Sequence, residues 1–269
     1  MSNKTNYGNW VSKSMLRTFY LVTGVIIVLT GISLSGLLSS WNPLVLRTLQ
    51  ISGTILTLIL VAASVYFTCS HRLFSYDGKE RIQERIVDYV VAHLNLPESA
   101  GTVLDIGCGS GVVSIKTARR YSWARITGID YWGKGWDYAK QQCEQNAESE
   151  GVKDRITFQK GDAGKLAFAD ESFDGAISNF VFHEVRTQPD KRQVVREALR
   201  VIKKGGSFAF HDLFLDRSLY GDIEELVAEL KKEGITKIEF IPTADTLKIP
   251  QLLRNKVMIG NIGLIYGVK

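Results

Sequence analysis

The chain has 269 residues, of which 45% are hydrophobic and 23% are charged, and this composition excludes a wholly disordered protein. The first 76 residues hold five basic residues and no Asp or Glu, so they carry the whole net charge of +5. The rest of the chain is formally neutral, which argues against a nucleic-acid partner, because such partners select basic folded domains. Three scattered cysteines and four histidines predict neither a disulfide framework nor a metal site.

Two uncharged apolar segments come first, and each reaches the ~20 residues that a helix needs to cross a bilayer. They predict transmembrane helices at about residues 18–38 and 46–70, separated by a turn at Asn42-Pro43. A cleaved signal peptide would have a shorter apolar core and no second span. A soluble helical hairpin would show a charged face. We therefore expect residues 1–72 to form a membrane anchor.

The basic residues around these segments predict their orientation. Both flanks are basic, with Lys4, Lys13 and Arg17 before the first span and Arg72, Lys79, Arg81 and Arg85 after the second, whereas the turn has only Arg47. Because cytoplasmic loops carry the excess of Lys and Arg, we expect a multi-pass membrane protein with both termini and the following domain in the cytoplasm.

Residues 73–100 are predicted to be an amphipathic connector. Ile82, Ile86, Val90 and Leu94 recur at helical spacing, and the helix should end near Pro97. We expect its apolar stripe to cover the next domain rather than a lipid surface.

Residues 101–269 alternate short apolar runs with longer amphipathic segments. The expected strands are 102–106, 125–130, 157–160, 173–179, 207–212, 237–241 and 256–267, and the expected helices are 111–120, 136–150, 189–202 and 219–233. Strands that alternate with helices predict parallel pairing in a doubly wound α/β sheet.

The sharpest motif is a glycine loop, and it directly follows the first strand as Asp105-Ile106-Gly107-Cys108-Gly109-Ser110-Gly111. Glycines permit unusual backbone angles and close approach of a ligand. A dinucleotide fingerprint would place the third glycine three positions after the second, whereas here it comes two positions after. This spacing argues against a nicotinamide-dependent oxidoreductase.

This loop resembles motif I of the class I S-adenosylmethionine (SAM) dependent methyltransferases. Four later segments resemble the family in the same order: Gly128-Ile129-Asp130, Lys160-Gly161-Asp162-Ala163, Ser178-Asn179-Phe180 and Lys203-Lys204-Gly205-Gly206. The resemblance covers roughly residues 80–269. It implies a Rossmann-like, seven-stranded, doubly wound α/β domain with SAM as its cofactor.

The resemblance also implies roles for individual residues. Asp105 would help to hold the amino group of SAM, and the methionine site would be shaped by the loop residues Gly107, Cys108, Gly109 and Gly111. Asp130 would bind the ribose, and the adenine would be contacted by Asp162 and Ala163. The post-strand region of the family would contain Asn179 and Phe180. Tyr131 and Trp132 would pack near the adenine, although Trp132 could equally be ordinary packing. The segment from Tyr131 to Trp136 is longer and more aromatic than is usual in the family.

His183 and Glu184 are the tentative catalytic residues, because they follow the fourth strand, where related enzymes hold their acceptors. Histidine is the side chain most able to move a proton near neutral pH. The alternative is that these two residues only cap the loop or bind backbone groups. His211-Asp212 ends the fifth strand, and there a structural role is the stronger interpretation, because such a pair can satisfy backbone groups.

The sequence as a whole predicts a membrane-anchored SAM-dependent methyltransferase. Its expected partners are the lipid bilayer and a small lipophilic or lipid-like acceptor, and residues 242–258 could line an interfacial entrance. The alternative is a membrane-bound SAM-binding scaffold or sensor without turnover. The acceptor atom and the oligomeric state stay open.

Overall fold

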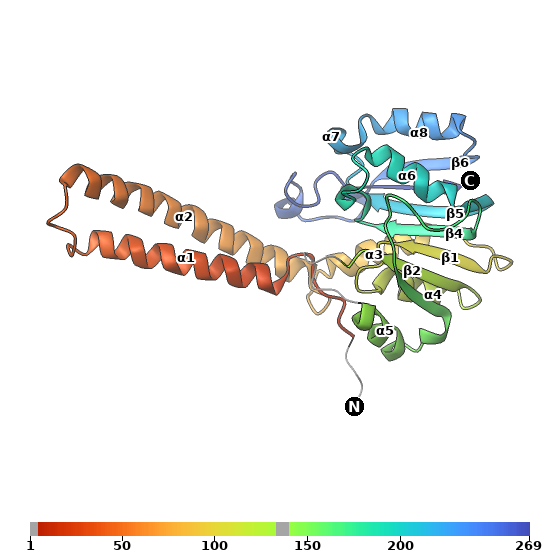
Figure 1. Ribbon diagram of the computed structural model, residues 1–269, viewed down its shortest axis with the longest axis horizontal. Helices are drawn as coiled ribbons and strands as arrows, with labels where there is room; N and C mark the ends of the chain where they lie inside the picture. Colours follow the sequence, from red (N-terminus) through yellow and green to blue (C-terminus); the bar gives the residue numbers. More distant parts are fainter. Residues whose placement is uncertain (1–4, 133–139) are drawn as a thin grey trace. The chain divides into compact units, whose positions relative to one another are not determined.

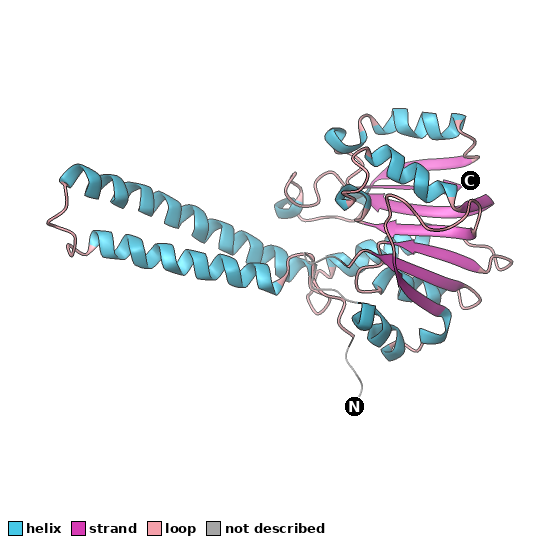
Figure 2. Ribbon diagram, in the orientation of Figure 1, coloured by secondary structure: helices cyan, strands magenta, loops and turns pink. Residues whose placement is uncertain are grey.

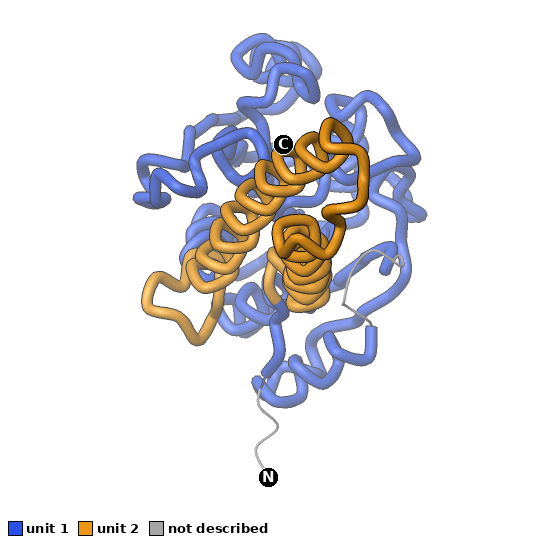
Figure 3. Tube along the Cα trace, turned by 90° about the vertical axis from the view of Figure 1, so that its left-hand side faces the viewer, with its two compact units in different colours: residues 1–8, 84–269 blue, residues 9–83 orange. Residues whose placement is uncertain are grey.

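The computed structural model describes residues 5–132 and 140–269. The chain divides into two compact units, which are coloured in Figure 3. Unit 2 comprises residues 9–83, and unit 1 comprises residues 1–8 together with residues 84–269. The long segment of unit 2 is thus inserted near the start of the chain that builds unit 1.

Unit 2 is dominated by an antiparallel hairpin of two long helices, α1 (Lys13–Leu34) and α2 (Pro43–Phe74) (Figure 1). Both helices begin earlier than the predicted 18 and 46, because a capping side chain starts each one. Ser12 accepts a hydrogen bond from the Met15 amide, and Asn42 accepts from the first turn of α2, with Pro43 at the first helical position.

The two helices meet along a row of small and hydroxylated side chains. Thr23 Oγ1 lies 3.0 Å from Ser64 Oγ, and Thr30 Oγ1 lies 3.2 Å from Thr57 Oγ1. A Cβ atom on Gly53 would lie 2.8 Å from Thr30 Oγ1, so this glycine permits the close approach. Small residues and interhelical hydrogen bonds of this kind are typical of helix pairs in membranes.

Both hairpin helices are long and apolar enough to cross a membrane by length and composition. Only 17% of the most apolar window of α1 and 6% of that of α2 are buried. The core helix of a soluble protein would have most of such a window buried.

Unit 1 is built on a seven-stranded sheet in the order β3-β2-β1-β4-β5-β7-β6 (Figure 2). Its strands are β1 (Thr102–Ile106), β2 (Arg125–Asp130), β3 (Ile156–Lys160), β4 (Phe173–Asn179), β5 (Ile202–Asp212), β6 (Lys237–Pro242) and β7 (Gly263–Val268). The first five pair in parallel, whereas β7 runs antiparallel to both β5 and β6. The predicted seven-stranded doubly wound sheet is confirmed, but the expectation of parallel pairing is wrong for β7, which lies between β5 and β6.

The helices of this unit are α3 (Ile82–His93), α4 (Val112–Arg120), α5 (Lys140–Ser149), α6 (Lys191–Arg200), α7 (Arg217–Tyr220), α8 (Ile223–Lys232) and α9 (Thr243–Thr246). The predicted helix 219–233 is two helices, because Gly221 has φ +67° and Asp222 caps a new helix. The predicted helix 189–202 ends at Arg200, since Ile202 begins β5. The predicted strand 256–267 starts only at Gly263.

Two further predictions concern α3 and α5. The connector predicted within 73–100 is α3, and its stripe residues Ile86, Val90 and Leu94 are fully buried, as expected for a helix that covers the sheet domain. The predicted helix 136–150 corresponds to α5, which begins at Lys140. Residues 136–139, including Trp136, lie outside the described residues.

An N-terminal arm, residues 5–8, packs on α5. The Asn6 amide donates to Asn146 Oδ1 at 2.8 Å, and Asn146 Nδ2 donates back to the Asn6 carbonyl at 2.8 Å. Ser110 Oγ, in the glycine loop, donates to the Tyr7 carbonyl at 2.9 Å. The arm therefore joins the start of the chain to the loop after β1.

Candidate functional site

The candidate site lies at the carboxyl ends of β1, β2, β4 and β5. The strand order reverses between β1 and β4, and in open α/β sheets ligands bind beyond the strand ends at such a reversal. The loop after β1 holds the glycines, β2 ends at Asp130, β4 ends at Asn179 and β5 ends at Asp212. The sheet thus brings the predicted residues of four segments to one edge.

The glycine loop has a backbone that only glycine adopts easily. Gly107, Gly109 and Gly111 have φ values of +76°, +54° and +84°, in the left-handed region that is costly for residues with a Cβ. A Cβ on Gly107 would lie 2.1 Å from Val181 Cγ2. The loop after β1 therefore packs directly against the loop after β4.

Asp105 lies beneath this loop and is fully buried. Its Oδ2 accepts a hydrogen bond from Ser114 Oγ at 2.5 Å, while its Oδ1 is buried without a hydrogen-bond partner among the described residues. Burial raises the pKa of Asp105 to about 7, although the Ser114 hydrogen bond opposes the shift and the charge of Asp130 adds to it. A buried carboxylate oxygen without a donor is costly, so this atom is suited to a donor from a bound ligand.

The carboxylate of Asp130 joins the glycine loop to the turn after β2. Its Oδ2 accepts from the Gly109 amide at 2.9 Å, and its Oδ1 accepts from the Trp132 amide at 2.7 Å. An ionised carboxylate offers about four lone-pair positions, so both oxygens can still accept from a ligand hydroxyl.

The two aromatic residues after β2 differ in their surroundings. Trp132 has φ +42°, and its indole Nε1 donates to the Gly109 carbonyl at 3.1 Å. The side chain of Trp132 therefore lies on the glycine loop. Tyr131 is 61% exposed, and the ammonium of Lys160 lies 4.9 Å from its ring centre. The segment's later residues 133–136 fall outside the described residues.

Asp162 and Ala163 follow β3, as predicted. Asp162 Oδ1 accepts from the Gly164 amide and from Thr187 Oγ1, both at 2.8 Å, so the carboxylate fixes its own turn. Ala163 is partly buried and packs against the hydrophobic core. Both residues follow β3, which pairs in parallel with β2.

Cys108 contributes backbone rather than side chain to the loop surface. Its thiol is buried, and burial, together with the neighbouring Cys143, raises the pKa of that thiol well above its ordinary value. The Cys108 amide donates to the Ile129 carbonyl at 2.9 Å. The residue thus ties the glycine loop to β2.

The loop after β4 carries a histidine that pairs with an aspartate at the end of β5, a pairing that the sequence did not indicate. His183 Nδ1 lies 2.8 Å from Asp212 Oδ1, and Asp212 is fully buried at the end of β5. Asp212 Oδ2 also accepts from the Val181 and Phe182 amides at 3.0 and 2.9 Å. One buried carboxylate therefore fixes both the loop and the imidazole.

The charges and hydrogen bonds of this pair shift the pKa values of both Asp212 and His183. Burial raises the pKa of Asp212, but the charge and hydrogen bond of His183 and the hydrogen bond from the Leu213 amide outweigh it and lower that pKa below its ordinary value. Burial lowers the pKa of His183, but the charge and hydrogen bond of Asp212 outweigh burial and raise it above 6.5. Because the ionised Asp212 only accepts, Nδ1 of a neutral His183 carries the hydrogen, and Nε2 is left as the basic nitrogen.

Glu184 differs from its neighbour. Its Oε1 lies 3.7 Å from His183 Nε2, and its side chain is about half exposed. It adds a favourable charge to the imidazole rather than a buried hydrogen bond.

Asn179, Phe180 and His211 form a second, buried group. His211 Nδ1 lies 3.0 Å from Asn179 Oδ1, and its Nε2 lies 2.8 Å from Thr243 Oγ1. Burial lowers the pKa of His211 to about 3, so this histidine is neutral and serves the structure. Phe180 has φ +58°, and its ring centre is 4.9 Å from that of His211.

No group of three or more His, Cys, Asp or Glu side chains able to hold a metal occurs within residues 5–132 and 140–269.

Comparison with known proteins agrees with this geometry. Residues 104–210 match the family model described as a methyltransferase domain. The chain is 34% identical over 161 residues to "Methyltransferase GfsG" of Streptomyces halstedii, covering 58% of this chain and 52% of that protein. It is 35% identical over 146 residues to the arsenite methyltransferase of Mus musculus, covering 51% and 37%.

A further relative is the sterol 24-C-methyltransferase of Aspergillus fumigatus, 28% identical over 138 residues, covering 51% of this chain and 34% of that protein. The chain thus spans about half the length of the first relative and about a third of the other two. A solved structure of geranyl diphosphate C-methyltransferase from Streptomyces coelicolor, in complex with Mg²⁺, geranyl diphosphate and S-adenosyl-L-homocysteine, has a TM-score of 0.51 at 14% identity, covering 70% of this chain and 79% of that one. This likeness shows the fold.

Proposed function

We propose that the chain is a membrane-bound, SAM-dependent methyltransferase that acts on a small lipophilic or lipid-like acceptor. Residues 104–210 match a methyltransferase domain model, and the similar protein GfsG is named a methyltransferase. The observation that carries the proposal is the glycine loop at the reversal of strand order, with the His183–Asp212 pair in the loop that packs against it. The exposed apolar hairpin supports the membrane location.

The described residues fit the cofactor. The orphaned Oδ1 of Asp105 is suited to accept from an amino group, and the three glycines keep side chains away from the loop surface. Asp130 would hold the ribose hydroxyls through its free lone pairs, and Asp162 with Ala163 would border the adenine. SAM supplies a methyl group on a positively charged sulfur, and the protein mainly supplies orientation.

His183 is proposed to remove the proton from an acceptor hydroxyl or amine. Its Nε2 accepts the proton, and the charge of Asp212 stabilises the imidazolium that results. Asp212 acts as a positioning residue, because it fixes the tautomer and the ring without touching the acceptor.

The lipophilic acceptor follows from the anchor. A hairpin that lies in a bilayer holds the domain where lipophilic molecules concentrate. Two of the similar proteins are named for a sterol and for geranyl diphosphate, whereas another is named for arsenite, so these names do not identify the acceptor. Residues 242–258 are proposed to border the acceptor entrance.

The basic flanks favour a cytoplasmic location for both termini and the catalytic domain. A cysteine introduced at Ser39, in the turn, should react with a membrane-impermeant thiol reagent added to intact cells, whereas one introduced at Ser75 should not. The reverse labelling pattern would refute this orientation and place both termini on the outer side of the membrane.

The test of the function uses membranes from cells that express the full chain. They are incubated with SAM carrying a deuterated methyl group, and organic extracts and aqueous fractions are analysed by mass spectrometry. We expect the label in a lipophilic product, and less of it with Asp130→Ala membranes at a limiting SAM concentration. Label only in water-soluble products would refute the lipophilic acceptor, and extraction of the chain by alkaline carbonate would refute the anchor.

A further inference from the structure

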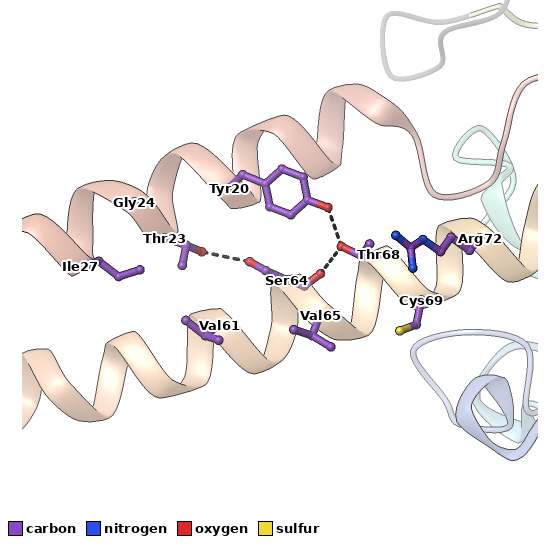
Figure 4. Close-up of a pocket in the computed structure, with 10 residues that line it drawn as sticks. All are labelled: Tyr20, Thr23, Gly24, Ile27, Val61, Ser64, Val65, Thr68, Cys69 and Arg72. Carbon is purple, nitrogen blue, oxygen red and sulfur yellow. Dashed lines mark hydrogen bonds between the residues drawn. The ribbon is translucent and has the colours of Figure 1, made fainter.

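A groove runs between α1 and α2 near the basic end of the hairpin (Figure 4). Its volume is 380 Å³. The α1 residues that line it, Tyr20, Thr23, Gly24 and Ile27, and the α2 residues, Val61, Ser64, Val65, Thr68, Cys69 and Arg72, recur at the spacing of one helix face. The groove is therefore a continuous feature of the two helices.

The hydroxyl groups in the groove are already hydrogen-bonded within the hairpin. Thr23 and Ser64 hydrogen-bond at the floor, where both are buried. Thr68 Oγ1 donates to the Ser64 carbonyl at 2.6 Å and lies 2.5 Å from the Tyr20 hydroxyl. The side chains that stay open to the surroundings are apolar, such as Val65, which is 58% exposed. This lining suits a hydrocarbon chain.

Arg72 ends the groove and is its only charged lining residue. Within the described part of unit 2 its guanidinium makes no hydrogen bond or ion pair, and residues 1–76 contain no carboxylate that could neutralise it. A guanidinium binds phosphate in bidentate fashion. The charge of the hairpin is thus complementary to a phosphate.

The length of the groove matches the thickness of the hydrocarbon region of one bilayer leaflet. From Val61 to Arg72 the helix rises about 16 Å, which is about half of the ~30 Å hydrocarbon core of a bilayer. A chain that starts at Arg72 would reach the bilayer centre near Val61.

We infer that this groove binds one anionic phospholipid, with its phosphate on Arg72 and one acyl chain along Ile27, Val61 and Val65. The inference rests on the proposed membrane anchor. Anionic lipids are enriched in the cytoplasmic leaflet, where the proposed topology places Arg72. The lipid would fill the groove and fix the basic end of the hairpin at the membrane surface.

The test uses the full chain, purified in detergent and equilibrated with equal amounts of phosphatidylglycerol and phosphatidylcholine. Native mass spectrometry then counts bound lipids. We expect Arg72→Gln to lower phosphatidylglycerol binding about fivefold, the factor for one basic residue at an anionic surface. Arg47→Gln, at the opposite end of α2, should leave binding unchanged. Val65→Trp should abolish binding by filling the groove, whereas Val25→Trp, outside the groove, should not.

Equal losses with Arg72→Gln and Arg47→Gln would show general charge attraction and overturn the site. Competition by glycerol phosphate as strong as that by phosphatidylglycerol would show a soluble-anion site and overturn the lipid assignment. A dimer that disappears with Val65→Trp would show a second copy in the groove and also overturn it. A chain that resists carbonate extraction but binds lipid independently of Arg72 refutes only this inference, whereas a chain released by carbonate refutes the anchor and the lipid site together.

Discussion

Replacing Gly107 by alanine tests the contact between the glycine loop and the loop after β4. The new Cβ would lie 2.1 Å from Val181 Cγ2 and 2.4 Å from Cγ1, and such overpacking costs ~1–3 kcal/mol. The φ of +76° adds ~1–2 kcal/mol for a residue with a Cβ. We therefore expect Gly107→Ala to lower the free energy of unfolding by ~2–5 kcal/mol.

Gly151 provides the matched control, because it has φ +69° and a Cβ added there would meet nothing within 4 Å. Gly151→Ala should show only the backbone part, ~1–2 kcal/mol. At ~2–4 °C per kcal/mol for a domain of this size, Gly107→Ala should unfold ~2–12 °C below Gly151→Ala. Thermal unfolding of the full chain in detergent, followed by near-ultraviolet circular dichroism, measures the difference.

A double variant tests the cost of the close contact separately from the cost of the backbone conformation. Adding Val181→Ala to Gly107→Ala removes the two closest methyl groups but leaves the Val181 Cβ, 2.7 Å from the new Cβ, so the pair should recover part of the ~1–3 kcal/mol of overpacking relative to the sum of the single effects. Equal melting temperatures for Gly107→Ala and Gly151→Ala, or strict additivity in the double variant, would refute the close contact between the two loops.

Three further predictions concern carboxylates. Asp130→Ala should weaken SAM binding by ~1.5–3 kcal/mol, or about 10- to 150-fold, in calorimetric titration; unchanged affinity would contradict the ribose role. Asp212→Asn should lower the turnover rate and, because Asp212 raises the pKa of His183, shift the acid limb of the pH–rate profile to lower pH; an unmoved limb would exclude His183 as the base. Burial raises the pKa of Asp174, but hydrogen bonds from Lys203, Gly101 and Thr102 outweigh it and lower that pKa to about 2. Its stabilisation is therefore present above the ordinary pKa of ~3.9 and lost as the pH falls toward 2, so the stability deficit of Asp174→Asn should shrink over that interval, and a constant deficit would contradict the shift.

The parts of the site that the sequence predicted are those held in short contiguous segments. The glycine loop and Asp130 are each read from a few neighbouring residues, and the structure brings them into hydrogen-bond contact. The pairing of His183 with Asp212 spans 29 residues, so no local pattern indicates it. The available signal was that both residues follow adjacent strands, β4 and β5, whose ends share one edge.

Two other features, the placement of β7 and the contacts of residues 5–8, depend on long-range packing and could not be predicted from the sequence. The antiparallel placement of β7 depends on which edge of β5 was free, and alternation of strands and helices does not reveal it. Residues 5–8 contain no periodic or apolar pattern, so their hydrogen bonds with Asn146 and Ser110 had no sequence signal. The roles of Tyr131, Trp132, Asp162 and Ala163 toward the cofactor stay predictions.

The N-terminal arm has a consequence for biosynthesis. Residues 5–8 are translated before the hairpin, whereas their binding partners Ser110 and Asn146 are translated only after the whole hairpin. On the proposed topology, the hairpin would be inserted by the translocation machinery before the arm can dock, so the cytoplasmic domain would complete its fold last. A recombinant fragment that starts at residue 84 would lack the arm, whereas a gene in which a short linker replaces residues 9–83 would retain it.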